Sequence, residues 1–284
     1  MPVEPLRIFV VADITHHRTA RVWGEVDAAL KHESIVRVGE CLDRKVTIPK
    51  ADIDLLVVVG GDGAILRACR RMRDDQLPIL GVNGGRLGFL ADLSPKDLVA
   101  KLDAIIERKF EIHRYQMFEC LLSTQAGEER HLGLNEVVVS CGAAARMIDI
   151  ELQINGELAT TYSADGLMIC TPVGSTAYNL AAGGPILRQT LRAFAITPIC
   201  PHTLTNRPIV ESAESVFRLR VPNAPDGATL VIDGQTRRLV THEDSIEVRK
   251  AAVSLMMAKV EGHNYYATLF HKLGWAGQNP NLGG

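Results

Sequence analysis

Residues 57–66 read Val57-Val58-Val59-Gly60-Gly61-Asp62-Gly63-Ala64-Ile65-Leu66 and join two structural patterns. The three β-branched residues predict a buried strand, and the small apolar residues after the glycines have helical spacing. Glycines that follow a parallel strand let backbone N–H groups approach an oxyanion, and the start of the next helix adds positive potential there. The stretch therefore predicts a strand–loop–helix unit of an α/β sheet with a candidate ligand site.

The carboxylate of Asp62 is unexpected in a loop that only binds phosphate, because the two groups repel each other. It suits a loop in which the acid accepts a hydroxyl proton or binds magnesium. The alternative is a plain strand-to-helix turn with Asp62 as the helix N-cap. The sequence contains neither a Walker A loop nor a standard dinucleotide fingerprint.

Strand and helix patterns alternate through the first hundred residues. Apolar runs predict three buried strands, at residues 7–12, 54–59 and 78–83. Helical spacing predicts three helices, at residues 19–31, 64–72 and 94–106. Ser94 is the expected N-cap of the last helix, with Pro95 in its first turn. This order predicts a parallel, doubly wound α/β sheet.

A second glycine-rich loop, GVNGGRLGFL at residues 81–90, follows the third predicted strand. Open α/β sheets bind ligands at the carboxyl ends of their strands, so the two loops are expected at one edge. Arg86 is a candidate phosphate contact, with a solvated side chain as the alternative. Together the two loops favour a nucleotide site.

From Tyr115 onward, short alternating runs bounded by turn residues predict a mainly β region. The predicted strands are 117–123, 136–140, 148–154, 166–170, 215–221, 229–232 and 245–249. Asn155-Gly156 predicts a hairpin. Residues 265–273 have helix-compatible spacing, and the Gly/Asn/Pro-rich tail 276–284 is predicted to be disordered.

A third cluster lies between Tyr162 and Pro185, where YSADG precedes a strand and TPVGSTAYNLAAGGP follows it. Small hydroxyl residues and glycines offer many hydrogen-bond donors with little bulk. Such a segment suits a ribose and a purine that lie against backbone, although an ordinary loop is the alternative.

Composition restricts the class of protein. With 46% hydrophobic residues, 23% charged residues and a formal net charge of −2, the chain is typical of a globular protein without a general affinity for nucleic acid. The six cysteines form no CxxC pair, which indicates reduced thiols. The N-terminus does not resemble a signal peptide, and no apolar run is long enough for a bilayer. We therefore expect a cytoplasmic protein that binds neither nucleic acid nor membrane.

In their order along the chain, these motifs resemble those of the bacterial ATP-NAD kinase family. The match extends from about Arg7 to Trp275 and comprises GGDG, NGGRLGFL, Leu134-Asn135-Glu136-Val137, YSADG, TPVGSTAYNLAAGGPI, Pro201-His202-Thr203-Leu204, Asn206-Arg207-Pro208, Asp233-Gly234-Gln235 and Lys272-Leu273-Gly274-Trp275. One departure is Ala164, which stands where the family has a serine in its (S)DG motif.

The resemblance implies a Rossmann-like, phosphofructokinase-like α/β domain at residues 1–112 and a β-rich domain of β-sandwich type at 113–255. The second domain would bind NAD and support oligomerisation. Residues 256–275 would pack back on the first domain, ahead of the tail 276–284. The family forms homodimers and homotetramers, so either assembly is expected.

The resemblance also implies the reaction, which is transfer of the γ-phosphoryl group of ATP to the 2′-hydroxyl of the adenosine ribose of NAD. Asp62 would accept the hydroxyl proton, Mg²⁺ would arrive with ATP, and no dedicated metal cage is expected. His202 is expected to be structural. Positions matching the family's NAD contacts are Asp62, Gly63, Arg67, Asn135, Glu136, Arg146, Ser163, Asp165, Val173, Thr176, Ala177, Tyr178, Asn179, Leu180, Ala181 and Gln235.

Two alternatives stay open at this point. Lipid kinases of the diacylglycerol or sphingosine type share GGDG, although the later motifs follow the NAD kinase pattern. A non-catalytic NAD(P)-sensing module would keep the pocket without the chemistry, against which the presence of Asp62 argues. The motifs do not distinguish ATP from polyphosphate as donor, NAD from NADH as acceptor, or feedback by NADPH or NADH.

Overall fold

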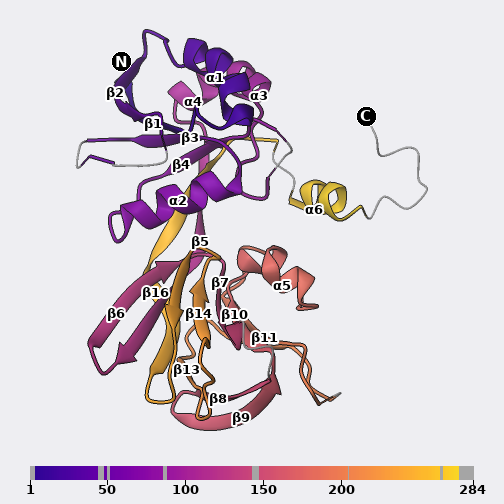
Figure 1. Cartoon of the computed structure of the whole chain (residues 1–284). Helices are drawn as coiled ribbons and strands as arrows, with labels where there is room; N and C mark the ends of the chain where they lie inside the picture. Colours follow the sequence, from indigo (N-terminus) through magenta and orange to yellow (C-terminus); the bar gives the residue numbers. More distant parts are fainter. Residues whose placement is uncertain are drawn as a thin grey trace. The chain divides into compact units, whose positions relative to one another are not determined.

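The computed structural model describes residues 4–43, 48–49, 52–85, 88–142, 147–203, 205–262 and 265–274. The chain divides into two compact units (Figure 1). Unit 1 consists of Met1–Arg114 together with Met256–Gly284, and unit 2 consists of Tyr115–Leu255. The predictions at Arg86, at Arg146 and in the tail 276–284 lie outside the described residues.

Unit 1 contains a parallel sheet with strand order β2-β1-β3-β4, followed by the end of β16. Its strands are β1 (Leu6–Ala12), β2 (Ile35–Cys41), β3 (Leu55–Val59), β4 (Ile79–Val82) and the last residues of β16 (Ser245–Lys259). Its helices are α1 (His17–Ala29), α2 (Asp62–Met72), α3 (Pro95–Ala100), α4 (Leu102–Ile106) and α6 (Tyr265–Leu273). Figure 1 shows α1, α3 and α4 on one face of the sheet and α2 on the other. The predicted doubly wound α/β fold is confirmed.

Two local predictions in unit 1 need correction. Strand β2 was not predicted, because it lies at the sheet edge and includes the half-buried Arg37 and the exposed Glu40. The single helix expected over 94–106 is two helices, since the backbone leaves the helical region at Lys101. The Ser94 cap is confirmed: its side chain accepts a bond from Asp97 N–H, and the Asp97 carboxylate completes a capping box.

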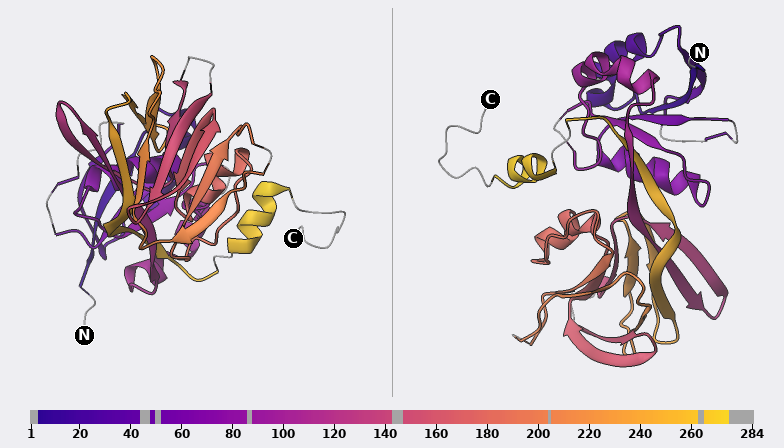
Figure 2. Two further views of the ribbon diagram at one scale, coloured as in Figure 1. Left: turned by 90° about the horizontal axis from the view of Figure 1, so that it is seen from below. Right: turned by 180° about the vertical axis from the view of Figure 1, so that it is seen from behind.

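Unit 2 is a sandwich of two sheets, which can be followed in Figure 2. One sheet has the order β12-β11-β10-β7-β14-β15, and the other contains β6-β5-β16-β13-β8-β9. Its elements are β5 (Glu111–Thr124), β6 (Gly127–Gly133), β7 (Glu136–Ser140), β8 (Ile148–Ile154), β9 (Glu157–Ala164), β10 (Gly166–Cys170), a 3₁₀ turn (Gly174–Thr176), α5 (Tyr178–Ala181), β11 (Ala193–Ile199), β12 (Ile209–Ser212), β13 (Phe217–Arg220), β14 (Thr229–Ile232), β15 (Thr236–Leu239) and β16.

Side chains from both sheets form one buried cluster, in which the rings of Phe194 and Phe217 meet edge to face with centroids 5.3 Å apart. The predicted β-sandwich is therefore confirmed. The Asn155-Gly156 hairpin between β8 and β9 is also confirmed, with φ of 53° and 90° at its two central residues. Strands β6, β11, β12 and β15 were not predicted, and β9 was predicted only as the second arm of this hairpin. Most of them are exposed or polar, so the alternating apolar signal is weak.

Candidate active site

A cavity of about 350 Å³ lies at the carboxyl ends of β1, β3 and β4. The chain leaves β1 through α1 toward β2, and it leaves β3 through α2 toward β4. The two crossovers diverge between β1 and β3, which makes this the switch point where open α/β sheets bind ligands. The cavity is lined by Asp13, His16, Arg18, Thr19, Val59, Gly60, Gly61, Gly63, Ala64, Arg67, Asn83, Gly84 and Gly85. The predicted residues Gly63 and Arg67 are both among them.

Two glycines of this lining are required by close contacts. A Cβ at Gly60, where φ is +154°, would lie 2.8 Å from the Cβ of Ala64. A Cβ at Gly84 would lie 2.8 Å from the carbonyl oxygen of Arg18. The wall therefore exposes backbone at its glycines, with Arg18 and Arg67 as cations and Asp13 as the one carboxylate among its described lining residues. Such a surface suits phosphate groups.

Asp62 is the first residue of α2, and Gly61, not Asp62, is the N-cap. The N-cap alternative is therefore wrong. The Asp62 carboxylate accepts hydrogen bonds from three consecutive backbone N–H groups of the second glycine loop. Oδ2 accepts from Phe89 at 2.9 Å, and Oδ1 accepts from Leu90 and Ala91, each at 3.0 Å. Asp62 thereby joins the two glycine loops and has a fixed orientation.

The second loop has no room for a side chain at Gly88, next to the Asp62 carboxylate. A Cβ at Gly88 would lie 2.1 Å from Asp62 Oδ1 and 2.9 Å from the carbonyl oxygen of Ala91. The Asp62 side chain nevertheless remains 29% exposed. The acid is thus held by the protein while solvent, or a ligand, still reaches it.

In unit 2, the predicted Asn135-Glu136 pair lies beside the Thr171–Gly174 turn. Thr171 N–H donates to the Asn135 carbonyl at 2.9 Å, and a Cβ at Gly174 would lie 2.0 Å from the same oxygen. The turn at Asp233 lies on the other side of the pair, because β7 pairs with both β10 and β14. The structure therefore brings together three motifs that are far apart in the sequence.

Asp233 holds the Asn135-Glu136 backbone. Its buried carboxylate accepts from the N–H groups of Leu134 (3.0 Å), Asn135 (2.8 Å) and Glu136 (3.2 Å). Burial, together with the negative charge of Asp233, raises the pKa of Glu136 to about 8. Glu136 Oε2 has no hydrogen-bond partner among the described residues. At neutral pH, Glu136 is thus a protonated acid with an unused polar atom.

The segment after β10 is a loop built on buried polar groups. The Asn179 side chain is fully buried; it donates to the Ser175 and Pro185 carbonyls and accepts from the Thr197 hydroxyl at 2.6 Å. The Ser175 hydroxyl donates to the Pro172 carbonyl. These bonds make the segment an ordered part of unit 2.

The remaining predicted residues of this segment differ in exposure. Val173 is buried, Thr176, Ala177 and Leu180 are half-buried, and Ala181 is exposed. Tyr178 is 47% exposed, so packing in the core does not account for its ring. The segment therefore presents side chains to solvent from a rigid base.

Ser163 and Asp165 lie apart from the Asn135 cluster within unit 2. They precede Gly166 at one end of β10, whereas Glu136 pairs with Cys170 at the other end. At about 3.4 Å per residue, Asp165 and Thr171 are on the order of 20 Å apart. The Ser163 hydroxyl donates to the Asp149 carboxylate, and Asp165 is exposed. Exposed Gln235 closes the turn that contains Asp233, because its N–H donates to the Ile232 carbonyl. His202 is exposed.

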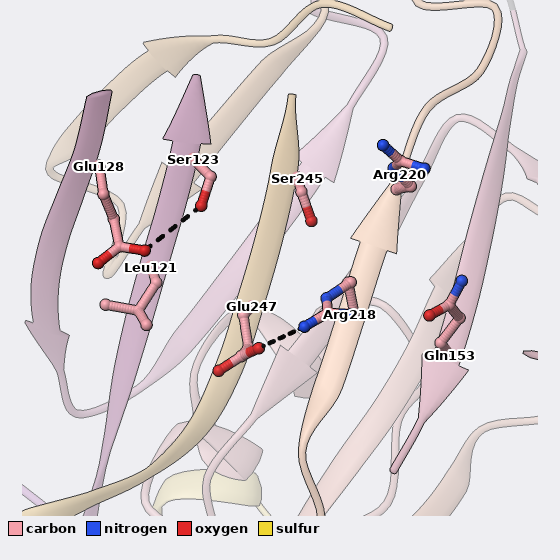
Figure 3. A pocket seen from close by; sticks show the side chains of 8 residues that line it. All are labelled: Leu121, Ser123, Glu128, Gln153, Arg218, Arg220, Ser245 and Glu247. Atoms are coloured by element: carbon pink, nitrogen blue, oxygen red, sulfur yellow. Dashed lines mark hydrogen bonds and ion pairs between the residues drawn. The ribbon is translucent and has the colours of Figure 1, made fainter. Parts of the chain in front are cut away.

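A second cavity lies on the outer face of the β6-β5-β16-β13-β8 sheet (Figure 3). Two of its charged groups, Arg218 and Glu247, form an ion pair at 3.0 Å. It contains none of the predicted site residues.

Among the residues that the structure describes, no group of three or more His, Cys, Asp or Glu side chains could hold a metal ion. No described helix is long and apolar enough to cross a membrane.

Sequence reasoning missed several residues that the structure places at these sites, among them Asp13, Arg18, Asp233 and Lys272. Asp13 follows the first predicted strand, so the rule that ligands bind at carboxyl ends of strands pointed to it. Asp233 lies in a quoted motif, but its partners are in a distant part of the chain. No local signal connects Lys272 to Asp62.

Comparisons with known proteins agree with each other. The family model described as the ATP-NAD kinase N-terminal domain matches residues 17–110, and that of the C-terminal domain matches residues 134–260. The chain is 45% identical over 228 residues to the NAD kinase of Rhodopirellula baltica, covering 80% of this chain and 73% of that protein. It is 40% identical over 228 residues to the NAD kinase of Citrifermentans bemidjiense, covering 79% of each.

Two solved structures are similar over nearly the whole chain. An NAD kinase from Archaeoglobus fulgidus in complex with ATP superposes with a TM-score of 0.77 at 29% identity, covering 96% of this chain and 100% of that one. Yeast NADH kinase complexed with NADH superposes with a TM-score of 0.82, covering 97% of this chain and 89% of that one. At 22% identity, the second likeness shows the fold alone.

Proposed function

Because the chain belongs to the NAD kinase family, we propose that it transfers the γ-phosphoryl group of ATP to the 2′-hydroxyl of the adenosine ribose of NAD. The product is NADP, and Asp62 accepts the hydroxyl proton. Membership of the NAD kinase family argues against a lipid-alcohol acceptor, and the enzyme's being a kinase argues against a non-catalytic sensing module.

The observation that supports this proposal best is the geometry of Asp62. Its carboxylate is held by three backbone N–H groups yet remains accessible. Phosphoryl transfer needs positioning, charge neutralisation and a group that takes the proton of the attacking hydroxyl. A fixed acid at the junction of two glycine loops supplies the last of these.

The cavity of unit 1 supports a donor phosphate site. Backbone at Gly60, Gly61 and Gly63, with Arg18 and Arg67, provides donors and positive charge for phosphate oxygens. Mg²⁺ would be delivered with ATP and would supply charge neutralisation at the phosphates. Asp13 fits this ion, because Mg²⁺ is commonly bound by one or two carboxylates plus substrate phosphates.

We assign the NAD contacts to the positions that match the family motifs. In unit 2, the protonated Glu136 carboxyl has an unpartnered oxygen and can donate a hydrogen bond to an acceptor on the dinucleotide. The exposed Tyr178 ring offers a flat surface for stacking. Asn135, beside the same turn, adds an amide.

We further propose that the enzyme is cytoplasmic and self-associates as a homodimer or homotetramer. None of the six cysteines, all of which the structure describes, forms a disulfide, as in a reducing compartment. The outer strands of one unit 2 sheet expose apolar side chains, at Ile209 and Val210 of β12 and Leu239 of β15.

The test is an assay of NADP formation with purified protein, NAD and MgATP, with NADP detected by an NADP-specific dehydrogenase. We expect NADP to accumulate, and EDTA in excess over Mg²⁺ to stop it. Failure to form NADP while a lipid alcohol is phosphorylated would contradict the proposal. NADP formation that persists in EDTA would contradict only the proposed role of magnesium, not the proposed reaction.

A further inference from the structure

Lys272, near the end of α6, lies beside the acid assigned as proton acceptor. Its ammonium nitrogen is 3.8 Å from Asp62 Oδ2 and 4.6 Å from the centroid of the Phe89 ring. Phe89 also donates its N–H to the same Oδ2. Lys272 therefore contacts both the carboxylate and the loop residue that holds it. Its side chain is 31% exposed, so the ammonium is neither buried nor fully solvated.

The two oxygens of Asp62 are not equivalent. Oδ1 accepts two backbone hydrogen bonds, whereas Oδ2 accepts one among the described residues. A carboxylate oxygen accepts about two hydrogen bonds, so Oδ2 retains capacity for one more. The 3.8 Å separation from Lys272 is longer than a hydrogen bond. Oδ2 is thus the oxygen that can receive a hydroxyl, and Lys272 lies on that side.

Another lysine of unit 1, Lys259, forms an ion pair with a different carboxylate. Lys259 is buried, 2.7 Å from the Asp92 carboxylate, and it also donates to the Leu90 carbonyl at 3.1 Å. Its charge is neutralised by Asp92 and supports the loop. The ammonium of Lys272, by contrast, has no carboxylate of a described residue closer than Asp62 at 3.8 Å. Its charge remains available to a ligand at Oδ2.

We propose that Lys272 is a positioning residue for phosphoryl transfer, orienting Asp62 Oδ2 and adding positive charge where the acceptor hydroxyl attacks. This inference rests on the proposed function. In the step, the hydroxyl proton passes to Asp62 Oδ2 and the hydroxyl oxygen forms a bond to the γ-phosphorus. The bond from that phosphorus to the β–γ bridging oxygen breaks, and ADP leaves with the electron pair. The Lys272 ammonium attracts both the ionised Asp62 and the negative phosphoryl oxygens.

The test compares Lys272→Met, Lys272→Arg and His271→Ala in the full-length protein. Methionine keeps an apolar stem over Phe89 without the charge, and arginine restores the charge. His271 is the exposed neighbour on the same helix and controls for damage to α6. Steady-state kinetics with NAD and MgATP give kcat and KM, and thermal melting reports folding.

We expect Lys272→Met to lower kcat about 100-fold, with KM for NAD within about threefold and an unchanged melting temperature. Lys272→Arg should retain at least a tenth of the wild-type kcat, and His271→Ala should stay within about twofold. A Lys272→Met enzyme with wild-type kcat would overturn the inference, as would equal losses in Lys272→Met and His271→Ala. A wild-type protein that forms no NADP would overturn the proposed function and this inference together. An active wild type with an unaffected Lys272→Met would overturn the inference alone.

Discussion

Asp62 in unit 1 and Asp233 in unit 2 have the same local arrangement, because each carboxylate accepts hydrogen bonds from three consecutive backbone N–H groups of a distant loop. Their surroundings differ. Asp62 is partly exposed and lies 3.8 Å from the ammonium of Lys272, whereas Asp233 is buried and lies near the carboxyl of Glu136. In unit 1, Lys272 leaves the Asp62 carboxylate accessible to a ligand. In unit 2, burial and, to a lesser degree, the charge of Asp233 raise the pKa of Glu136, which makes Glu136 a neutral acid.

This comparison predicts that loss of charge has its largest effect at Asp62. The variant Asp62→Asn keeps the shape of the side chain but cannot accept the hydroxyl proton. We expect turnover to fall by ~10²–10⁴ while NAD affinity stays within a few-fold, measured by steady-state kinetics and by calorimetric titration. The exposed Asp52→Asn is the matched control and should behave like wild type. Comparable turnover in Asp62→Asn would remove this residue from the mechanism.

At Asp233, removal of the carboxylate should lower the free energy of unfolding and should affect turnover less directly. The variant Asp233→Ala leaves the buried N–H groups of Leu134 and Glu136, and the half-buried one of Asn135, without their acceptor. Because each unpaired buried donor costs about 1–3 kcal/mol, we expect a loss of ~2–4 kcal/mol in the free energy of unfolding, measured with urea. Asp233→Asn, which retains an acceptor oxygen, should lose less. A loss below about 0.5 kcal/mol in Asp233→Ala would contradict this account.

The raised pKa of Glu136 predicts a pH dependence with a definite sign. Because its pKa is about 8 in the folded protein and 4.5 is its ordinary value, the folded state binds one more proton between these limits. Its contribution to stability is therefore complete below pH 4.5 and is lost as the pH rises through about 8. We expect the free energy of unfolding to fall by at most about 1.4 kcal/mol from pH 6 to pH 7 on this account.

The control is Glu136→Gln, which mimics the neutral acid and should show a flatter dependence over the same pH range. Both proteins would be unfolded with urea at several pH values. Parallel curves for the variant and the wild type would show that Glu136 is not the group responsible.

The smallest expected effect is at the exposed surface of the same region. Tyr178→Ala removes a ring that is 47% exposed, so the free energy of unfolding should change by no more than about 0.5 kcal/mol. KM for NAD should rise several-fold, because the stacking surface is lost. An unchanged KM, determined under the same conditions as for wild type, would argue against a contact between this ring and NAD.

Local patterns predicted most of the fold. The apolar runs located β1, β3 and β4, and the Asn155-Gly156 dipeptide located a hairpin, because these signals depend on residues close in sequence. Strand β2 was missed because an edge strand needs no continuous apolar run. The polar strands of unit 2 were missed for the same reason, since one of their faces is in contact with solvent.

The candidate site was predicted less completely, and the reason is again distance along the chain. The sequence by itself determined that two glycine loops follow buried strands and that Asp62 stands in the first of them. Only the tertiary structure decided what Asp62 touches. Its partners at Phe89, Leu90, Ala91 and Lys272 come from another loop and from the last helix. Which groups meet a carboxylate depends on strand order and on how the chain returns to the sheet, and no local pattern of residue types records either.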